Sequence, residues 1–178
     1  NESKGKSIKF VDKTDQIAPF FKELGMVTDA SWKDINEDNF ADLLVVGEWM
    51  SPRLFQSNGQ VLQDISKKSG IDSWGGWWNN CSWVDLDKDG DLDFVAGNLG
   101  LNYKYKASPE EPFQVYAHDF DQNNSLDIVL GYQVGEKSFP LRGRECSSNQ
   151  MPFIKKDFPN YDVFGKATLM DVYGSKGL

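Results

Sequence analysis

Side chains that carry oxygen atoms recur at one fixed spacing in residues 85–93, which read DLDKDGDLD. Aspartates stand at positions 1, 3, 5 and 9 of this stretch, and Gly90 at position 6 can adopt a left-handed turn. Ca²⁺ binds about 6–8 oxygen ligands from carboxylates, amides, backbone carbonyls and water. Because aspartates this close together repel one another unless a cation neutralises them, the spacing predicts a loop that wraps around one Ca²⁺.

The same pattern occurs twice more, in residues 34–42 (DINEDNFAD) and residues 119–127 (DFDQNNSLD). Positions 1, 3, 5 and 9 are aspartate or asparagine in all three copies, and position 6 is glycine or asparagine, which best tolerate positive φ. We expect the backbone carbonyl of position 7 to complete each site, which gives up to three Ca²⁺ ions. The predicted ligands are Asp34, Asn36, Asp38, Phe40, Asp42, Asp85, Asp87, Asp89, Asp91, Asp93, Asp119, Asp121, Asn123, Ser125 and Asp127.

The residues that flank these loops predict β-hairpins and not EF-hands. An EF-hand loop needs a bidentate Glu at position 12, where this sequence has Val45, Ala96 and Leu130. After position 9, each copy continues as a short apolar run that ends in glycine, which is typical of a buried strand. Each loop is also preceded by a strand-like segment, so we predict hairpins whose turns hold the metal.

The segments WVDLDKDGDLDFVAGNLG and DINEDNFADLLVVGEW resemble the FG-GAP repeat, also called the VCBS repeat, of integrin-type β-propellers. The similarity is closest in style to bacterial cell-surface proteins with VCBS repeats. The sequence departs from the motif that gives the family its name, because no clear Phe-Gly precedes each loop and other residues replace Gly-Ala-Pro.

The resemblance implies an all-β fold with minor helix: a partial β-propeller of about three FG-GAP-like blades, each with a calcium-binding hairpin loop. A length of 178 residues suits one domain, so we expect residues 1–178 to form a single partial propeller. Its repeats are expected at about residues 27–65, 80–105 and 112–139, and residues 140–178 are expected to be an irregular C-terminal segment.

Composition narrows the range of partners and compartments. The net charge is −8 and no basic cluster exists to neutralise phosphates, which argues against a nucleic-acid partner. No run of about 18 apolar residues exists, so we expect no membrane span. Calcium loops of modest affinity suit a calcium-rich exterior, which favours an extracellular, cell-surface or periplasmic location. Cys81 and Cys146 could pair or stay free, and the sequence leaves both alternatives open.

Two other stretches are candidates for ligand binding. Trp74, Trp77 and Trp78 lie close together with two glycines, either as an aromatic platform for a sugar or peptide or as packing between blades. Arg142 and Arg144 either form a recognition site or belong to an ordinary connection between blades.

The sequence contains no nucleophile elbow, phosphate loop or zinc-ligand spacing. We therefore predict a non-enzymatic, calcium-stabilised propeller module of an extracellular or cell-surface protein that binds a glycan or a protein. The alternative is a calcium-dependent carbohydrate-active enzyme that resembles the propellers of polysaccharide lyases, or its accessory domain. Because a closed propeller needs about four to eight blades, we also expect the chain to belong to a larger propeller or to self-associate.

Overall fold

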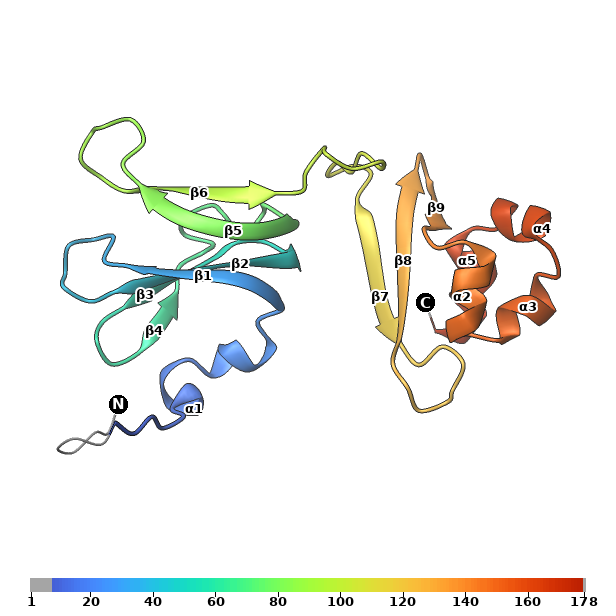
Figure 1. Ribbon diagram of the computed structural model, residues 1–178, viewed down its shortest axis with the longest axis horizontal. Coiled ribbons are helices and arrows are strands. Elements are labelled where there is room, and N and C mark those ends of the chain that lie inside the picture. Colours follow the sequence, from blue (N-terminus) through green and yellow to red (C-terminus); the bar gives the residue numbers. More distant parts are fainter. Residues whose placement is uncertain (1–7, 178) are drawn as a thin grey trace. The chain divides into compact units, whose positions relative to one another are not determined.

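The computed structural model describes residues 8–177, which form two compact units where the sequence suggested a single domain. The N-terminal unit ends at Gly100 and the C-terminal unit begins at Leu101 (Figure 1). The chain as a whole is mostly antiparallel β-strand, as the sequence predicted, whereas helices hold more residues than strands in the C-terminal unit. Within the described residues, no helix is both long and apolar enough to cross a bilayer.

Four strands of the N-terminal unit form an antiparallel meander, in which each strand pairs with the next along the chain. This meander spans residues 26–64, which is nearly the range of the first predicted repeat, residues 27–65. Two further strands form a hairpin that meets the end of the meander's second strand through the pair Glu48 and Trp77. The elements are α1 (Thr14–Ile17), η1 (Pro19–Glu23), β1 (Met26–Lys33), β2 (Asp42–Met50), β3 (Arg53–Ser57), β4 (Leu62–Asp64), β5 (Gly76–Val84) and β6 (Asp93–Asn98).

Strand β2 is the centre of this unit, because both of its faces are buried. Leu44 and Val46 face one side and pack into a cluster that includes Cys81 of β5. Leu43 and Val45 face the other side, since successive side chains of a strand point in opposite directions. Burial on both faces explains why β2 reads as a continuous apolar run rather than as an alternating one.

The second face of the meander is covered by the segment that precedes β1. The ring of Phe20 stacks on Phe55 of β3 with centroids 4.9 Å apart, and Phe21 meets Phe55 edge-on at 5.2 Å. Ala18 and Leu24 pack into the same cluster. The meander is therefore enclosed between this aromatic segment on one face and the β5–β6 hairpin on the other.

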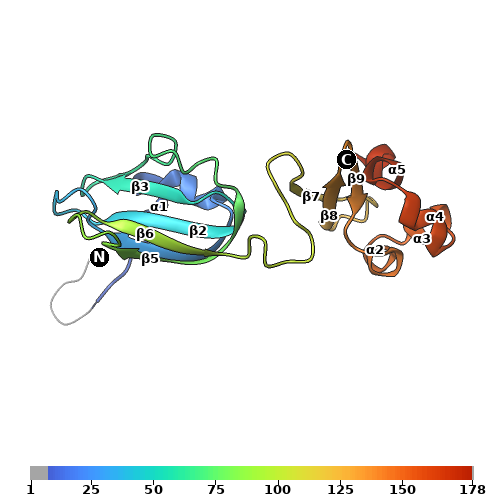
Figure 2. The same ribbon diagram turned by 90° about the horizontal axis from the view of Figure 1, so that it is seen from above.

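The C-terminal unit is a three-stranded antiparallel sheet with short helices on one side, as both views show (Figures 1 and 2). Val129 of β8 packs against Ile154, Leu169 and Tyr173 from the helices. The elements are β7 (Phe113–His118), β8 (Asp127–Val134), β9 (Lys137–Pro140), α2 (Arg144–Gln150), α3 (Phe153–Asp157), α4 (Tyr161–Lys166), α5 (Leu169–Tyr173) and η2 (Gly174–Lys176).

The helices correct the expectation that residues 140–178 are irregular. Side-chain caps define two of their starts: the Asn160 side chain accepts from the N–H of Val163, and Thr168 forms a capping box with Asp171. Each of these helices is too short to show a clear 3.6-residue period, and short helices depend on tertiary packing for their stability. Packing against the sheet therefore decides this part of the fold.

Candidate functional site

Three loops connect paired antiparallel strands, as the sequence predicted: loop 1 (residues 34–42), loop 2 (residues 85–93) and loop 3 (residues 119–127). In each loop, the aspartate at position 9 is also the first residue of the second strand. Loop 1 joins β1 to β2, loop 2 joins β5 to β6, and loop 3 joins β7 to β8. The strand pairs that close them are Lys33 with Asp42, Val84 with Asp93, and His118 with Asp127.

Two hydrogen bonds from a backbone N–H to a side-chain oxygen recur in all three loops. The carboxylate at position 9 accepts from the N–H of position 2, and the side chain at position 5 accepts from the N–H of position 7. The first kind joins Ile35 to Asp42 (3.2 Å), Leu86 to Asp93 (3.0 Å) and Phe120 to Asp127 (3.0 Å). The second kind joins Phe40 to Asp38 (2.8 Å), Asp91 to Asp89 (3.1 Å) and Ser125 to Asn123 (2.8 Å). The loops thus share one turn geometry.

Left-handed residues explain how each loop turns so sharply. Position 6 has positive φ in every loop, as its residue types predicted. Position 4 has positive φ as well, although its long side chains gave no sign of this in the sequence. The angles at positions 4 and 6 are 60° and 69° for Glu37 and Asn39, 65° and 97° for Lys88 and Gly90, and 61° and 66° for Gln122 and Asn124.

Carboxylate oxygens converge in loops 2 and 3. One oxygen from each of Asp85, Asp87 and Asp89 lies within 4.8 Å of the others, and the same holds for Asp119, Asp121 and Asp127. Oδ1 of Asp85 and Oδ1 of Asp121 are both buried and have no hydrogen-bond partner among residues 8–177. A buried carboxylate oxygen without a partner is costly, so these two atoms fit a bound cation.

Loop 1 is organised partly by its own hydrogen bonds. Nδ2 of Asn36 donates to Asp38 at 2.8 Å, and the Asp34 carboxylate accepts from the N–H groups of Asp38 and Asn39. Among the described residues, its aspartates do not form a cluster like those of loops 2 and 3. The ring of Phe40 lies against the turn at Gly59, where a Cβ would come within 2.4 Å of it.

In loop 2, the pKa values of Asp89 and Asp91 are shifted in opposite directions. The backbone N–H of Asp91 donates to Asp89 and lowers the pKa of that carboxyl. The pKa of Asp91 is raised, first by its hydrogen bond with Asp89 and then by the negative charges of Asp89, Asp93 and Asp87. The neighbouring carboxylates of loop 2 therefore disfavour the charged form of Asp91.

A family model of the FG-GAP-like repeat matches residues 34–96. The matched range begins at position 1 of loop 1 and ends within β6, so it includes both loops of the N-terminal unit. The predicted resemblance is confirmed for this range. No curated protein matches the chain.

The FG-GAP-like range also includes the three tryptophans predicted as a platform, and the structure separates them. Trp78 packs into the core between the meander and the β5–β6 hairpin, and its Nε1 donates to the carbonyl of Trp74 at 3.1 Å. Trp77 pairs instead with Trp49, with ring centroids 5.3 Å apart. The Trp74 ring lies 6.2 Å from that of Phe94. The three rings therefore have different neighbours, and a role of Trp74, Trp77 and Trp78 in ligand binding stays a prediction.

Trp49 was not predicted from the sequence, although it lies in the Gly47-Glu48-Trp49 stretch that replaces the FG-GAP family's Gly-Ala-Pro. It sits at an irregularity in β2, where the pairing with β5 shifts between Glu48 and Met50. Its φ is 59°, which is unusual for a bulky aromatic residue. The departure from the family pattern was the signal that could have identified it.

The two predicted arginines lie in the C-terminal unit, outside the FG-GAP-like range. Arg144 donates to the carbonyls of Phe158 (2.6 Å) and Pro159 (3.2 Å), and its guanidinium lies over the ring of Tyr161. It therefore holds the connection between α3 and α4 in place. Arg142 is exposed, and its Nη1 lies 3.4 Å from Oε1 of Gln150. Of these two arginines, only Arg142 has a side chain that is accessible to a partner.

Proposed function

We propose that this chain is a non-enzymatic module of the β-propeller type, stabilised by Ca²⁺, in an extracellular or cell-surface protein that binds a glycan or protein partner. The observation that carries the proposal is the pair of buried, unpartnered carboxylate oxygens on Asp85 and Asp121. Each belongs to a cluster of three aspartates in a loop of the same geometry.

The donor set favours Ca²⁺ over other common cations. All candidate side-chain ligands are carboxylate or amide oxygens, the hard donors that Ca²⁺ and Mg²⁺ prefer. Mg²⁺ requires a tighter octahedron and retains its waters, whereas Ca²⁺ accepts more ligands and flexible geometry. In loops 2 and 3, Asp85, Asp87, Asp89, Asp119, Asp121 and Asp127 would hold the ion. We expect loop 1 to bind more weakly, because Asn36 already occupies an oxygen of Asp38.

The placement of position 9 explains how an ion would stabilise the fold. Asp127 is 2% exposed and is the first residue of β8, whose Val129 packs in the core of the C-terminal unit. When bound, the ion supplies the positive charge that offsets repulsion among the loop carboxylates. The aspartates in turn fix the start of a buried strand, so occupancy of the loop and stability of the sheet are linked.

Thermal unfolding with and without Ca²⁺ tests this proposal. A ligand in hundredfold excess over its Kd stabilises the folded state by about 2.7 kcal/mol per site, so the melting temperature should rise by several degrees. Asp87→Asn and Asp121→Asn should each reduce this rise and the binding measured by calorimetry. Asp72→Asn, an exposed aspartate outside the loops, is the matched control. Identical melts in Ca²⁺ and in chelator would refute the calcium assignment, and an equal response to Mg²⁺ would refute its selectivity.

A further inference from the structure

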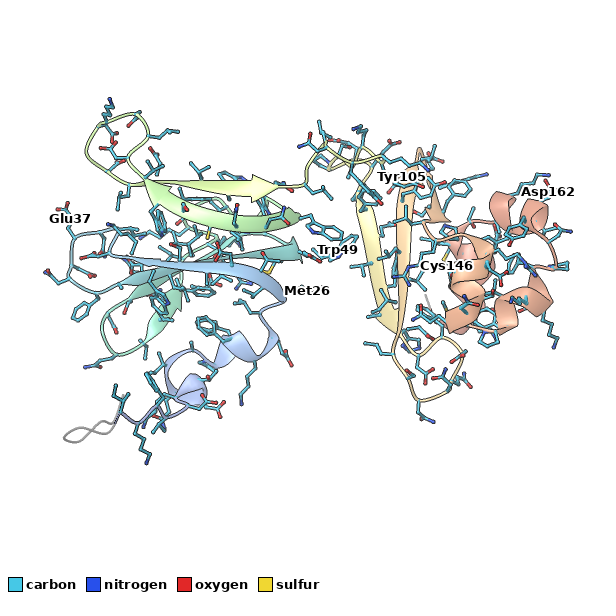
Figure 3. All side chains as sticks on the ribbon, in the orientation of Figure 1. Met26, Glu37, Trp49, Tyr105, Cys146 and Asp162 are labelled. Atoms are coloured by element: carbon cyan, nitrogen blue, oxygen red, sulfur yellow. The ribbon has the colours of Figure 1, made fainter. Side chains whose placement is uncertain are left out.

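Trp49, Trp77 and Asn98 gather at one end of the N-terminal unit, opposite to loops 1 and 2. Strand β2 leaves loop 1 at Asp42 and reaches Trp49 near its other end. Strand β5 begins beside Trp77 and runs toward loop 2, and β6 returns from loop 2 to Asn98. Figure 3 shows Trp49 at this end of the unit, together with Met26 where β1 begins. The strands thus carry the calcium loops at one end and this aromatic pair at the other.

The backbone at Trp49 holds a conformation that its side chain disfavours. In a regular strand, neighbouring residues such as Glu48 and Trp49 would face opposite sides of the sheet. Here the shift in pairing after Glu48 and the φ of 59° bring the Trp49 ring to within 5.3 Å of the Trp77 ring. Bulges of this kind re-aim side chains, and strained residues of this kind concentrate at functional sites. The strained backbone at Trp49 therefore makes this ring pair a candidate binding site.

Two polar residues, Asn98 and Glu48, contact or pair with the backbone of Trp77. Oδ1 of Asn98 accepts from the N–H of Trp77 (3.1 Å) and from the N–H of Gly100 (3.0 Å), which sets the orientation of the amide. A Cβ on Gly76 would come within 2.8 Å of Nδ2 of Asn98 and 2.9 Å of Nε1 of Trp78, so the glycine leaves room for this amide on the Trp78 side. Glu48 is directly opposite Trp77 in the pairing of β2 with β5, which places both side chains on one face.

We propose that Trp49 and Trp77, with Glu48, bind a neutral saccharide, and that Asn98 positions the backbone of Trp77. The C–H face of a sugar ring packs on an indole, while the Glu48 carboxylate on the Trp77 side suits its hydroxyl groups. The Glu48 carboxylate disfavours an acidic saccharide, because two negative charges would lie close together. This inference rests on the proposed function as a binding module, and it names the chemical class of partner.

Isothermal titration in Ca²⁺ tests the inference directly. The probes are neutral oligosaccharides of glucose, mannose, galactose and xylose, with oligogalacturonate as the acidic comparison. At least one neutral probe should bind the wild-type chain, and Trp77→Ala and Trp49→Gly should each weaken that binding at least tenfold. Trp49→Gly suits the test because glycine adopts this φ without strain, so it should melt above Trp49→Ala. Trp32→Ala, which removes a tryptophan that is 57% exposed on β1, should bind as the wild type does.

Three outcomes would overturn the inference: no neutral probe binds, Trp49→Gly keeps its affinity, or only oligogalacturonate binds. The calcium melts separate this result from the proposed function. If Ca²⁺ raises the melting temperature while no saccharide binds, the saccharide inference fails and the calcium-stabilised module stands. If a neutral saccharide binds while Ca²⁺ leaves the melting temperature unchanged, the calcium assignment fails and the aromatic site stands.

Discussion

The carboxylate of Asp42 accepts a hydrogen bond of 2.8 Å from the backbone N–H of Ser57. Asp42 closes loop 1 and opens β2, whereas Ser57 is the last residue of β3. The second oxygen of Asp42 accepts from the N–H of Ile35 inside the loop. A single buried side chain therefore joins the loop to a strand that pairs on the other edge of β2.

Replacement of Asp42 should expose this link. Asp42→Ala leaves the N–H groups of Ile35 and Ser57 without their acceptor, and each unsatisfied buried group costs about 1–3 kcal/mol. We expect the free energy of unfolding in chelator to fall by about 2 kcal/mol or more, measured by urea denaturation. Asp42→Asn keeps one carbonyl oxygen as an acceptor and should lose less. An Asp42→Ala variant as stable as Asp72→Asn would show that the link contributes nothing.

The ion pair between Arg53 and Asp64 should make part of the stability sensitive to acid. Partial burial raises the pKa of Asp64, but hydrogen bonds from Ser66 and Arg53 outweigh this effect and hold the pKa below its ordinary value. The stabilisation is therefore complete above the unfolded pKa of about 3.9 and is lost as the pH falls through the folded pKa. Urea midpoints measured in chelator between about pH 5 and pH 3 should fall less steeply for Asp64→Asn than for the wild type.

The two cysteines should react at different rates with a thiol reagent. Both are free in the structure; Cys81 is buried and Cys146 is exposed. Burial, together with the nearby Asp29 carboxylate, raises the pKa of the Cys81 thiol to about 11. Because the thiolate is the reactive species, we expect one fast thiol at pH 8 in the folded chain and two in urea. Cys146→Ser should abolish the fast reaction, and a persistent fast phase would contradict this assignment.

Arg142 and Arg144 provide a matched pair in the C-terminal unit. Removal of the Arg144 side chain leaves the carbonyls of Phe158 and Pro159 without their charged donor. Hydrogen bonds to charged groups contribute about 1.5–3 kcal/mol, so Arg144→Ala should lower the urea midpoint clearly. Arg142→Ala, at an exposed position, should change it by less than about 0.5 kcal/mol. Equal effects of the two substitutions would contradict a structural role for Arg144.

The aromatic segment before β1 should keep the N-terminal unit from associating. Phe20 and Phe21 cover Phe55, Leu43 and Val45, and loss of both rings uncovers an apolar face. We expect the double variant Phe20→Ala with Phe21→Ala to bind an apolar dye and to scatter more light at micromolar concentration. A double substitution at the exposed residues Lys67 and Lys68 is the control. A monodisperse double phenylalanine variant without dye binding would mean that other residues shield this face.

The parts of the fold that could be predicted from sequence are those that local chemistry encodes. The oxygen spacing of the loops predicted their hairpins, and the apolar run of residues 43–46 predicted the buried strand β2. The left-handed conformations of Glu37, Lys88 and Gln122 could not be predicted, because long side chains give no sign of positive φ.

Other features depended on contacts between distant residues. Trp77 and Trp78 are neighbours in sequence, yet one pairs with Trp49 and the other packs in the core. The helices after β9 depend on their packing against Val129 rather than on sequence periodicity. In both cases the deciding partner lies on another strand or sheet, which spacing along the chain does not reveal.

The shared geometry of the three loops occurs on sheets of different kinds. Loop 1 closes a strand pair within a meander, loop 2 closes a hairpin, and loop 3 closes a sheet backed by helices. Asparagine replaces aspartate at different positions from copy to copy. The same two hydrogen bonds from backbone N–H groups to side-chain oxygens nevertheless persist. The two hydrogen bonds of the turn therefore do not depend on the kind of sheet to which the flanking strands belong. Grafted onto an unrelated antiparallel hairpin, the nine residues of a loop should therefore form the same two hydrogen bonds.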